Sequence, residues 1–102
     1  MFARVATFEG VNVQAARETM DEAEALIRPL VEGIPGFQGY LDLMSEGGKM
    51  ISIVLFDSEA SAGAAEPVFD EEMPKKLGHI FSEWEGKRVS VDRYAVIAQS
   101  SA

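Results

Sequence analysis

Cysteine is absent from this sequence of 102 residues, and histidine and tryptophan occur once each. Without cysteine the chain forms no disulfide and performs no thiolate chemistry. A single histidine cannot supply a usual set of transition-metal ligands, so we expect no metal site. The length fits one domain over residues 1–102, because folded domains cluster around about 100 to 150 residues.

Positive charge is also scarce. Nine Lys and Arg residues stand against seventeen Asp and Glu, which gives a formal net charge of -8. This excess of negative charge repels nucleic acid and anionic lipid, so neither is an expected partner. The longest nearly apolar run, Met50 to Phe56, is far shorter than the roughly 20 residues of a membrane helix. The start, Met1 to Arg4, lacks the apolar core of a signal peptide, and we expect a cytoplasmic location.

Four segments rich in β-branched and aromatic residues predict strands. Gly47 and Gly48 between the second and third segments indicate a hairpin, because glycine adopts the positive φ that tight hairpin turns require. In the second segment, alternation places four residues on one face: Phe37, Gly39, Leu41 and Leu43. The predicted strands are Phe2 to Glu9, Phe37 to Met44, Met50 to Phe56 and Val89 to Gln99.

Apolar residues recur at steps of three and four between Val13 and Val31, which predicts an amphipathic helix. Asn12 precedes it as an N-cap, because its side-chain oxygen can accept a hydrogen bond from a free backbone N–H. Pro29 lacks an N–H and should bend the last turns. We expect Gly33 to end the helix in a left-handed conformation.

A second helical region follows the third strand. Asp57 or Ser58 can cap its start, and Pro67 and Pro74 interrupt it. Pro74 is compatible with a helix only in the first turn, so we predict two helical pieces. These pieces are Glu59 to Glu66, and Glu71 or Pro74 to Glu85.

The order β-α-β-β-α-β predicts an α+β fold of ferredoxin-like topology, with strands one and three at the centre of an antiparallel sheet and the helices on one face. The third strand, Met50 to Phe56, is apolar on both faces. An antiparallel sheet that faced water on one side would instead show a polar row. We therefore expect a second copy of the chain to cover the other face, giving a homodimer.

The turns and strand ends carry a family resemblance, found in four segments: Phe8-Glu9-Gly10, Pro35-Gly36-Phe37-Gln38-Gly39, Leu55-Phe56-Asp57-Ser58-Glu59 and Val91-Asp92-Arg93-Tyr94. In these the chain resembles the dimeric α/β-barrel superfamily and, within it, the antibiotic biosynthesis monooxygenase-like group. The resemblance implies a homodimeric barrel with a pocket in each subunit between sheet and helices. Members include cofactor-independent oxygenases of aromatic polyketides, quinol oxygenases and haem-degrading enzymes.

His79 is a candidate catalytic residue, because a neutral imidazole can act as a general base or a haem ligand near physiological pH. The alternative is a partly exposed helix residue with no role in chemistry. Haem-degrading members carry a tryptophan about three turns before the histidine and an asparagine on the first strand. Here Phe69 stands ten residues before His79, and the first strand has no asparagine, which argues against haem degradation.

Tyr40, Phe69 and Trp84 are candidate ligand-binding residues, because their rings offer flat apolar surface for a planar molecule. Phe81 and Tyr94 are further candidates, and for each ring the alternative is core or interface packing. Four strand residues carry charge and are either buried catalytic partners or, more plainly, polar groups at strand ends and the dimer rim: Arg4, Asp42, Asp92 and Arg93.

Together these features favour a monooxygenase-like homodimer that holds a small aromatic or quinol-like molecule beneath the helices. Such a protein would let the activated substrate react directly with oxygen in a shielded pocket, with His79 as proton acceptor and with no metal or flavin cofactor. The rival hypothesis is a non-catalytic homodimer that binds a small ligand or serves as an interaction module.

Overall fold

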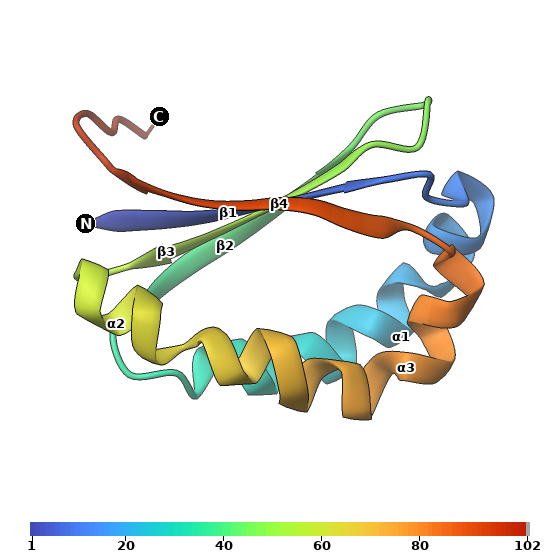
Figure 1. The fold of residues 1–102 in the computed structure, drawn as a ribbon, viewed down its shortest axis with the longest axis horizontal. Coiled ribbons are helices and arrows are strands. Elements are labelled where there is room, and N and C mark those ends of the chain that lie inside the picture. The colour runs from blue at the N-terminus through green and yellow to red at the C-terminus, as the bar shows by residue number, and fades with distance from the viewer. Residues whose placement is uncertain (102) are drawn as a thin grey trace.

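The structure, a computed structural model, describes residues 1–101 and contains one four-stranded sheet with all its helices on one side (Figure 1). The elements in chain order are β1 (Phe2–Glu9), α1 (Val13–Glu32), β2 (Phe37–Met44), β3 (Met50–Phe56), α2 (Glu59–Ala64), the π-helical segment η1 (Val68–Glu72), α3 (Met73–Trp84) and β4 (Lys87–Ala95).

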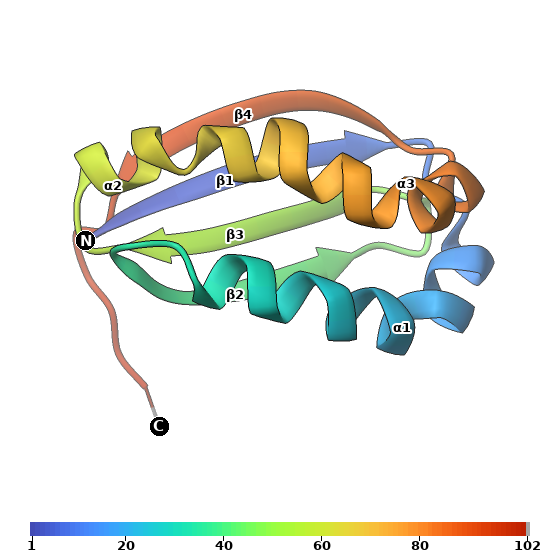
Figure 2. The same cartoon turned by 90° about the horizontal axis from the view of Figure 1, so that it is seen from below.

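The strands lie in the order β2-β3-β1-β4, and every neighbouring pair is antiparallel. The predicted ferredoxin-like fold class is therefore confirmed. Seen from the helix side, α1 lies under the β2 side of the sheet, and α2, η1 and α3 run beside it under β1 and β4 (Figure 2). In the single chain the sheet is open, with β2 and β4 as its edges. No helix of the described residues is both long enough and apolar enough to cross a membrane.

The predicted caps explain where the helices begin. The Asn12 side chain accepts a hydrogen bond from the Ala15 N–H at 3.1 Å, and Ser58 caps α2 through the Ser61 N–H at the same distance. The C-terminal prediction for α1 is wrong, because Gly33 has a right-handed φ of -81°. The chain continues through a further turn, and the left-handed residue is Gly36, with φ of +84°. There a side chain would collide with Ser61, so glycine is required.

The two predicted helical pieces are joined rather than separated. Pro67 adopts a helical conformation before η1, and a π-helical turn leads directly into α3. Pro74 lies in the first turn of α3, as predicted. The resulting segment passes under β1 and β4 as one continuous wall (Figure 2).

Two strand predictions need correction. Phe37 was expected on the same face as Gly39, but the β2–β3 register shifts between these two residues, so Phe37 packs with the helices instead. A bulge of this kind adds one residue to the strand, so the side chains before the bulge point to the opposite face of the sheet. β4 ends at Ala95 rather than Gln99: its pairing with β1 ends where Ala95 lies opposite Phe2, and one further hydrogen bond joins the Val96 N–H to the Met1 carbonyl oxygen at 2.9 Å.

The two faces of the sheet differ in what covers them. Toward the helices, Val54 and Phe56 of β3 are buried in one apolar cluster, and Leu77 and Ile80 of α3 are buried in a second one. The opposite face of β3 is also apolar, as the sequence predicted, and no other element of residues 1–101 covers it. By strand alternation this open face carries Val5, Leu41, Leu43, Ile51, Ile53, Leu55 and Tyr94.

Candidate functional site

A cavity of about 410 Å³ lies between the sheet and the helices. Its roof is formed by the helix-facing side chains of β1, β2 and β3, and its floor by α1, η1 and α3. This volume falls within the range of about 300 to 1,000 Å³ that is usual for small-molecule sites. Most of the lining is apolar, and its aromatic members are Phe8, Tyr40, Phe69, Phe81 and Trp84.

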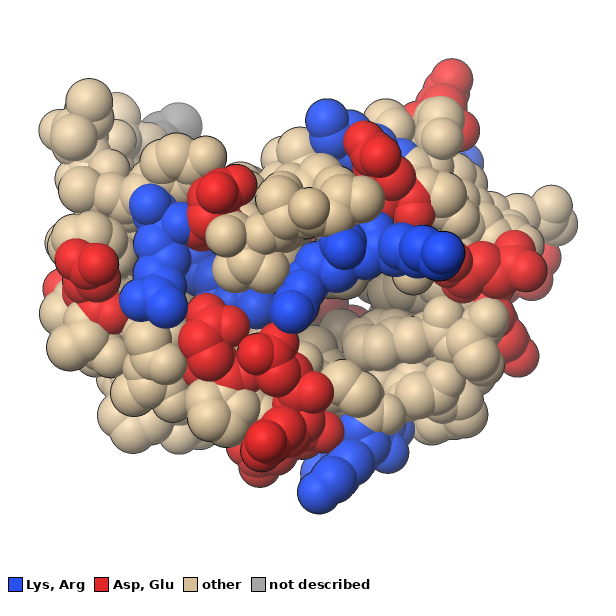
Figure 3. Space-filling model, in the orientation of Figure 1, with Lys and Arg blue, Asp and Glu red and all other residues tan. Residues whose placement is uncertain are grey.

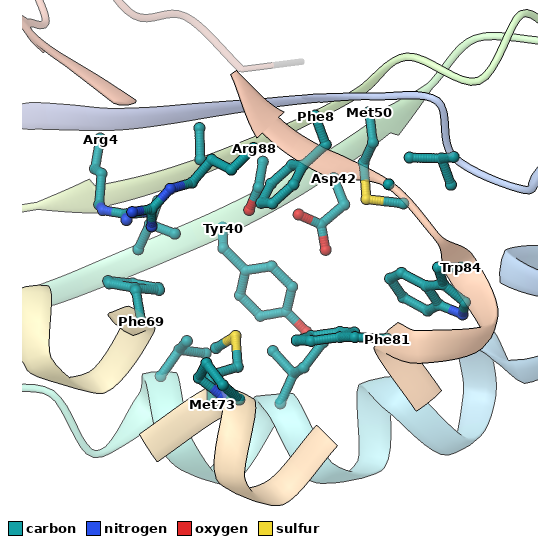
Figure 4. A pocket seen from close by; sticks show the side chains of 18 of the residues that line it. Arg4, Phe8, Tyr40, Asp42, Met50, Phe69, Met73, Phe81, Trp84 and Arg88 are labelled. Atoms are coloured by element: carbon teal, nitrogen blue, oxygen red, sulfur yellow. The ribbon is translucent and has the colours of Figure 1, made fainter. Parts of the chain in front are cut away.

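The polar atoms of two cavity aromatics are bonded to α1. The Trp84 indole Nε1 donates a hydrogen bond to Thr19 Oγ1 at 2.7 Å, and the Thr19 hydroxyl in turn donates to the Ala15 carbonyl at 2.8 Å. The Tyr40 hydroxyl donates to Glu24. With these donors engaged, both side chains present ring surface to the cavity (Figure 4). Only 7% of Trp84 is exposed.

The hydrogen bond from Tyr40 changes the acidity of both partners. It lowers the pKa of the Glu24 carboxyl, and the neighbouring Arg28, 2.8 Å away, lowers that pKa further. Burial raises the pKa of the Tyr40 hydroxyl, and its bond to Glu24 adds to the rise. Tyr40 therefore stays a neutral donor toward α1 over the physiological range and does not supply a base to the cavity.

Arg4 of β1 is buried at one end of the cavity, with 2% of the residue exposed. Its guanidinium forms two hydrogen bonds to Glu66, at 3.0 and 3.3 Å, and lies 4.0 Å from the centre of the Phe69 ring. The simpler interpretation of Arg4, as a polar group at a strand end or the dimer rim, is wrong because the residue is buried. A buried guanidinium needs a counter-charge, and Glu66 provides it.

The cavity opens between β4 and the η1–α3 segment. Asp70, Pro74 and Arg88 line this side and are exposed, and Arg88 forms an ion pair with Asp70 at 2.7 Å. In the space-filling view, Lys and Arg side chains form a band along β4, and the surface is hollowed beneath it (Figure 3). A small molecule could thus enter past an ion pair that joins the two sides of the opening.

Asp42 of β2 is the ionisable group that projects into the middle of the cavity. Its carboxylate lies among Phe8, Tyr40, Phe81 and Trp84 (Figure 4). Burial raises the pKa of this carboxyl, and the negative charge of Glu24 adds to the rise, whereas hydrogen bonding by the Ser52 hydroxyl opposes it. A carboxylate in such surroundings is a stronger proton acceptor than one in water.

Some of the predicted site residues line the cavity, and others lie outside it. Tyr40, Phe69 and Trp84 come together in the cavity wall. His79 is not part of that wall; it lies on the outer side of α3 with 63% of its side chain exposed, 3.7 Å from Glu22. This position is incompatible with a role as base inside the cavity. Tyr94, 55% exposed, lies on the open face of the sheet instead.

The two remaining charged candidates, Asp92 and Arg93, lie outside the cavity. Asp92 is exposed on the open sheet face, opposite Val5, and Arg93 is exposed beside Gly63 of α2. Neither of them lines the cavity. Among residues 1–101, no group of three or more His, Asp or Glu side chains is arranged to hold a metal ion.

Fold and cavity together define a class: small ferredoxin-like α+β proteins with an open apolar sheet face and a ligand-sized cavity under the sheet. Solved structures share this fold. A dimeric ferredoxin-like protein from an uncultured marine organism superposes with a TM-score of 0.71 at 15% identity, over 99% of this chain and 98% of the other. A Bordetella bronchiseptica protein, provisionally assigned as an antibiotic biosynthesis monooxygenase, gives 0.69 at 14% identity, over 95% and 97%.

A third structure contains a ligand. The monooxygenase from ActVA-Orf6 of Streptomyces coelicolor, in complex with nanaomycin D, superposes with a TM-score of 0.70 at 15% identity, over 99% of this chain and 91% of the other. No protein-family model matches the sequence, and no curated protein does. The resemblance to antibiotic biosynthesis monooxygenase-like proteins is thus confirmed as a likeness of fold across nearly the whole chain.

Proposed function

We propose that this chain binds a small, flat, largely apolar molecule in the cavity and oxygenates it without a cofactor. The observation that carries the proposal is the pairing of aromatic walls with one central carboxylate, Asp42. Tyr40, Phe69 and Trp84 would contact the ring system of the ligand. The fold shared with monooxygenases supports this assignment.

The chemistry follows from the surroundings of Asp42. A phenol or quinol becomes electron-rich when its hydroxyl proton is removed, and Asp42 takes the place of His79 as the acceptor of that proton. The ring then transfers electrons to molecular oxygen. One oxygen atom remains on a ring carbon and the other leaves as water, so that a phenol and O₂ give a quinone and water. Exclusion of bulk water by the apolar walls protects the reactive ring anion.

We also propose that the protein works as a homodimer, in which the open sheet faces of two copies close on each other. The face carries large apolar side chains in water, including Leu41 and Leu43, which are 53% and 45% exposed. Contiguous exposed apolar surface of this kind is typical of protein interfaces. The marine protein of the same fold is dimeric, which supports the assignment.

A second candidate function is ligand binding without catalysis. The position of His79 favours it, because the one histidine of the chain lies on the outer surface of α3 and cannot take part in proton transfer within the cavity. In this case Asp42 would hold the ligand but no oxygen would be consumed.

Oxygen uptake separates the two candidates. The purified protein would be incubated with 1-naphthol in air, with an oxygen electrode to follow consumption and mass spectrometry under ¹⁸O₂ to follow incorporation into naphthoquinone. Protein-dependent uptake with one labelled oxygen in the product supports the oxygenase. Saturable binding without uptake supports the non-catalytic alternative. Native mass spectrometry of the protein purified from cells would report the subunit number and any molecule that it retains.

A further inference from the structure

The charges of the cavity wall are balanced except at one residue. Arg4 is paired with Glu66 at 3.0 Å, and Arg88 is paired with Asp70 at 2.7 Å. Asp42 is the remaining charged residue of the lining, and within residues 1–101 it takes part in no ion pair. The two cations of the wall are therefore neutralised before any ligand arrives, whereas the Asp42 carboxylate is not.

The other polar side chains of the wall have limited capacity to orient a ligand. The Tyr40 hydroxyl donates to Glu24 and the Trp84 indole donates to Thr19, so neither offers a free donor to the cavity. Ser52 lies opposite Asp42 in the β2–β3 register. Away from the ion pairs of Arg4 and Arg88, a polar atom on a bound molecule therefore meets Asp42 and its neighbour Ser52 among apolar side chains.

We infer that Asp42 determines which molecules the cavity accepts: it favours an uncharged aromatic ring that carries a hydroxyl and excludes the same ring carrying a carboxylate. The inference rests on the proposed function, since it names the substrate class of the same cavity. An ionised carboxylate only accepts hydrogen bonds; the Ser52 hydroxyl supplies one donor to Asp42, and a ligand hydroxyl can supply another. A ligand carboxylate would bring a second negative charge beside Asp42 with no free cation to offset it.

An amine is the less favoured ligand. An ammonium group would match the charge of Asp42, but it would itself have to be stripped of water in an apolar cavity. A hydroxyl is uncharged and has one donor, so Asp42 alone satisfies it. The raised pKa of the Asp42 carboxyl agrees with this assignment, because it reflects incomplete solvation that a donor from a ligand would relieve.

Three probes that share one ring system test the inference: 2-naphthol, 2-methoxynaphthalene, which keeps the oxygen but lacks the donor, and 2-naphthoate, which is anionic. Binding would be measured by calorimetry at neutral pH. We expect the wild-type protein to bind 2-naphthol about tenfold to a hundredfold more tightly than 2-methoxynaphthalene, the range for a hydrogen bond to a charged group. We expect 2-naphthoate to bind most weakly.

Two variants separate the hydrogen bond from the charge. Asp42→Leu removes the acceptor and should reduce the preference for 2-naphthol over 2-methoxynaphthalene to less than about threefold, since only the apolar contribution remains. Asp42→Asn keeps an acceptor but removes the charge, so 2-naphthoate should bind more tightly while part of the hydroxyl preference persists. Asp21→Asn, an exposed position on α1 outside the cavity, removes the same charge and should change neither preference.

The possible failures differ from one another. If the wild-type protein binds 2-naphthol and 2-methoxynaphthalene equally, or if Asp42→Leu keeps the hydroxyl preference, the role of Asp42 is refuted while the cavity remains a binding site. If none of the three probes binds, the proposed function fails and the inference fails with it. The comparison of probes on the wild-type protein decides the matter even if a variant does not fold.

Discussion

Replacing Glu66 by glutamine would leave the Arg4 guanidinium without its counter-charge. Only 3% of the Arg4 side chain is exposed, so water cannot take over the role of the carboxylate. Removing one partner of a fully buried ion pair costs about 3 to 5 kcal/mol. Glu66 is 26% exposed, and the Phe69 ring still faces the cation at 4.0 Å. Both features reduce the expected loss to about 2 to 3 kcal/mol.

Urea denaturation of four proteins would measure this loss: the wild type, Glu66→Gln, Arg4→Met and the double variant. The double variant should recover most of the stability lost in Glu66→Gln, because methionine fills similar space and no unpaired charge remains. Glu46→Gln, at an exposed position of the β2–β3 hairpin, serves as the control for losing one negative charge and should stay within about 0.5 kcal/mol of wild type. A Glu66→Gln protein as stable as that control would refute the account of the buried pair.

Three further predictions concern other parts of the chain. Ile53→Asp should convert a dimer to monomers in light scattering, because each copy would bury an unpaired carboxylate at the interface; a persistent dimer would contradict the proposed sheet pairing. Gly48→Ala should destabilise the fold by about 1 kcal/mol or more in thermal unfolding, since φ there is +87° and a Cβ would lie 2.6 Å from the Val11 carbonyl oxygen; unchanged stability would contradict this. Asp42→Asn should be more stable than wild type at neutral pH. Because burial raises the pKa of Asp42, its ionisation destabilises the wild-type fold only as pH rises above the ordinary aspartate pKa. The stability gained by Asp42→Asn should therefore vanish in acid, and a gain that does not depend on pH would contradict this prediction.

Local patterns were sufficient to predict most of the elements. The bounds of β1, β2 and β3 match the predicted segments, and Asn12 caps α1 as expected. These features depend on side-chain periodicity and on hydrogen bonds within a few residues, which the sequence contains directly. The strand order also followed, because short connections and a single hairpin leave few topologies for β-α-β-β-α-β.

The errors fall where a distant partner decides the conformation. The end of β4 is set by the start of β1, and the orientation of Phe37 is set by a bulge against β3. At Gly33 the chain continues turning until Gly36, where close approach to Ser61 requires glycine. Propensity and periodicity describe a segment by itself, so none of these long-range contacts is visible in them.

The candidate site shows how the same limit affects chemistry. Residue type alone made His79 a candidate base, yet its place on the outer side of α3 removes it from the cavity. Asp42 was interpreted as a charge at a strand end or the dimer rim, although the hairpin sequence already indicated which residue it faces. Asp42 and Ser52 lie equally far from Gly47 in the hairpin, which predicts that they face each other on one side of the sheet. Tyr40, two residues earlier, shares that side. The register of a hairpin therefore predicts from the sequence that an acid, a hydroxyl and an aromatic ring share one face of the sheet. The cavity around them forms only because α1 and α3 pack over that face, and the register does not predict this packing.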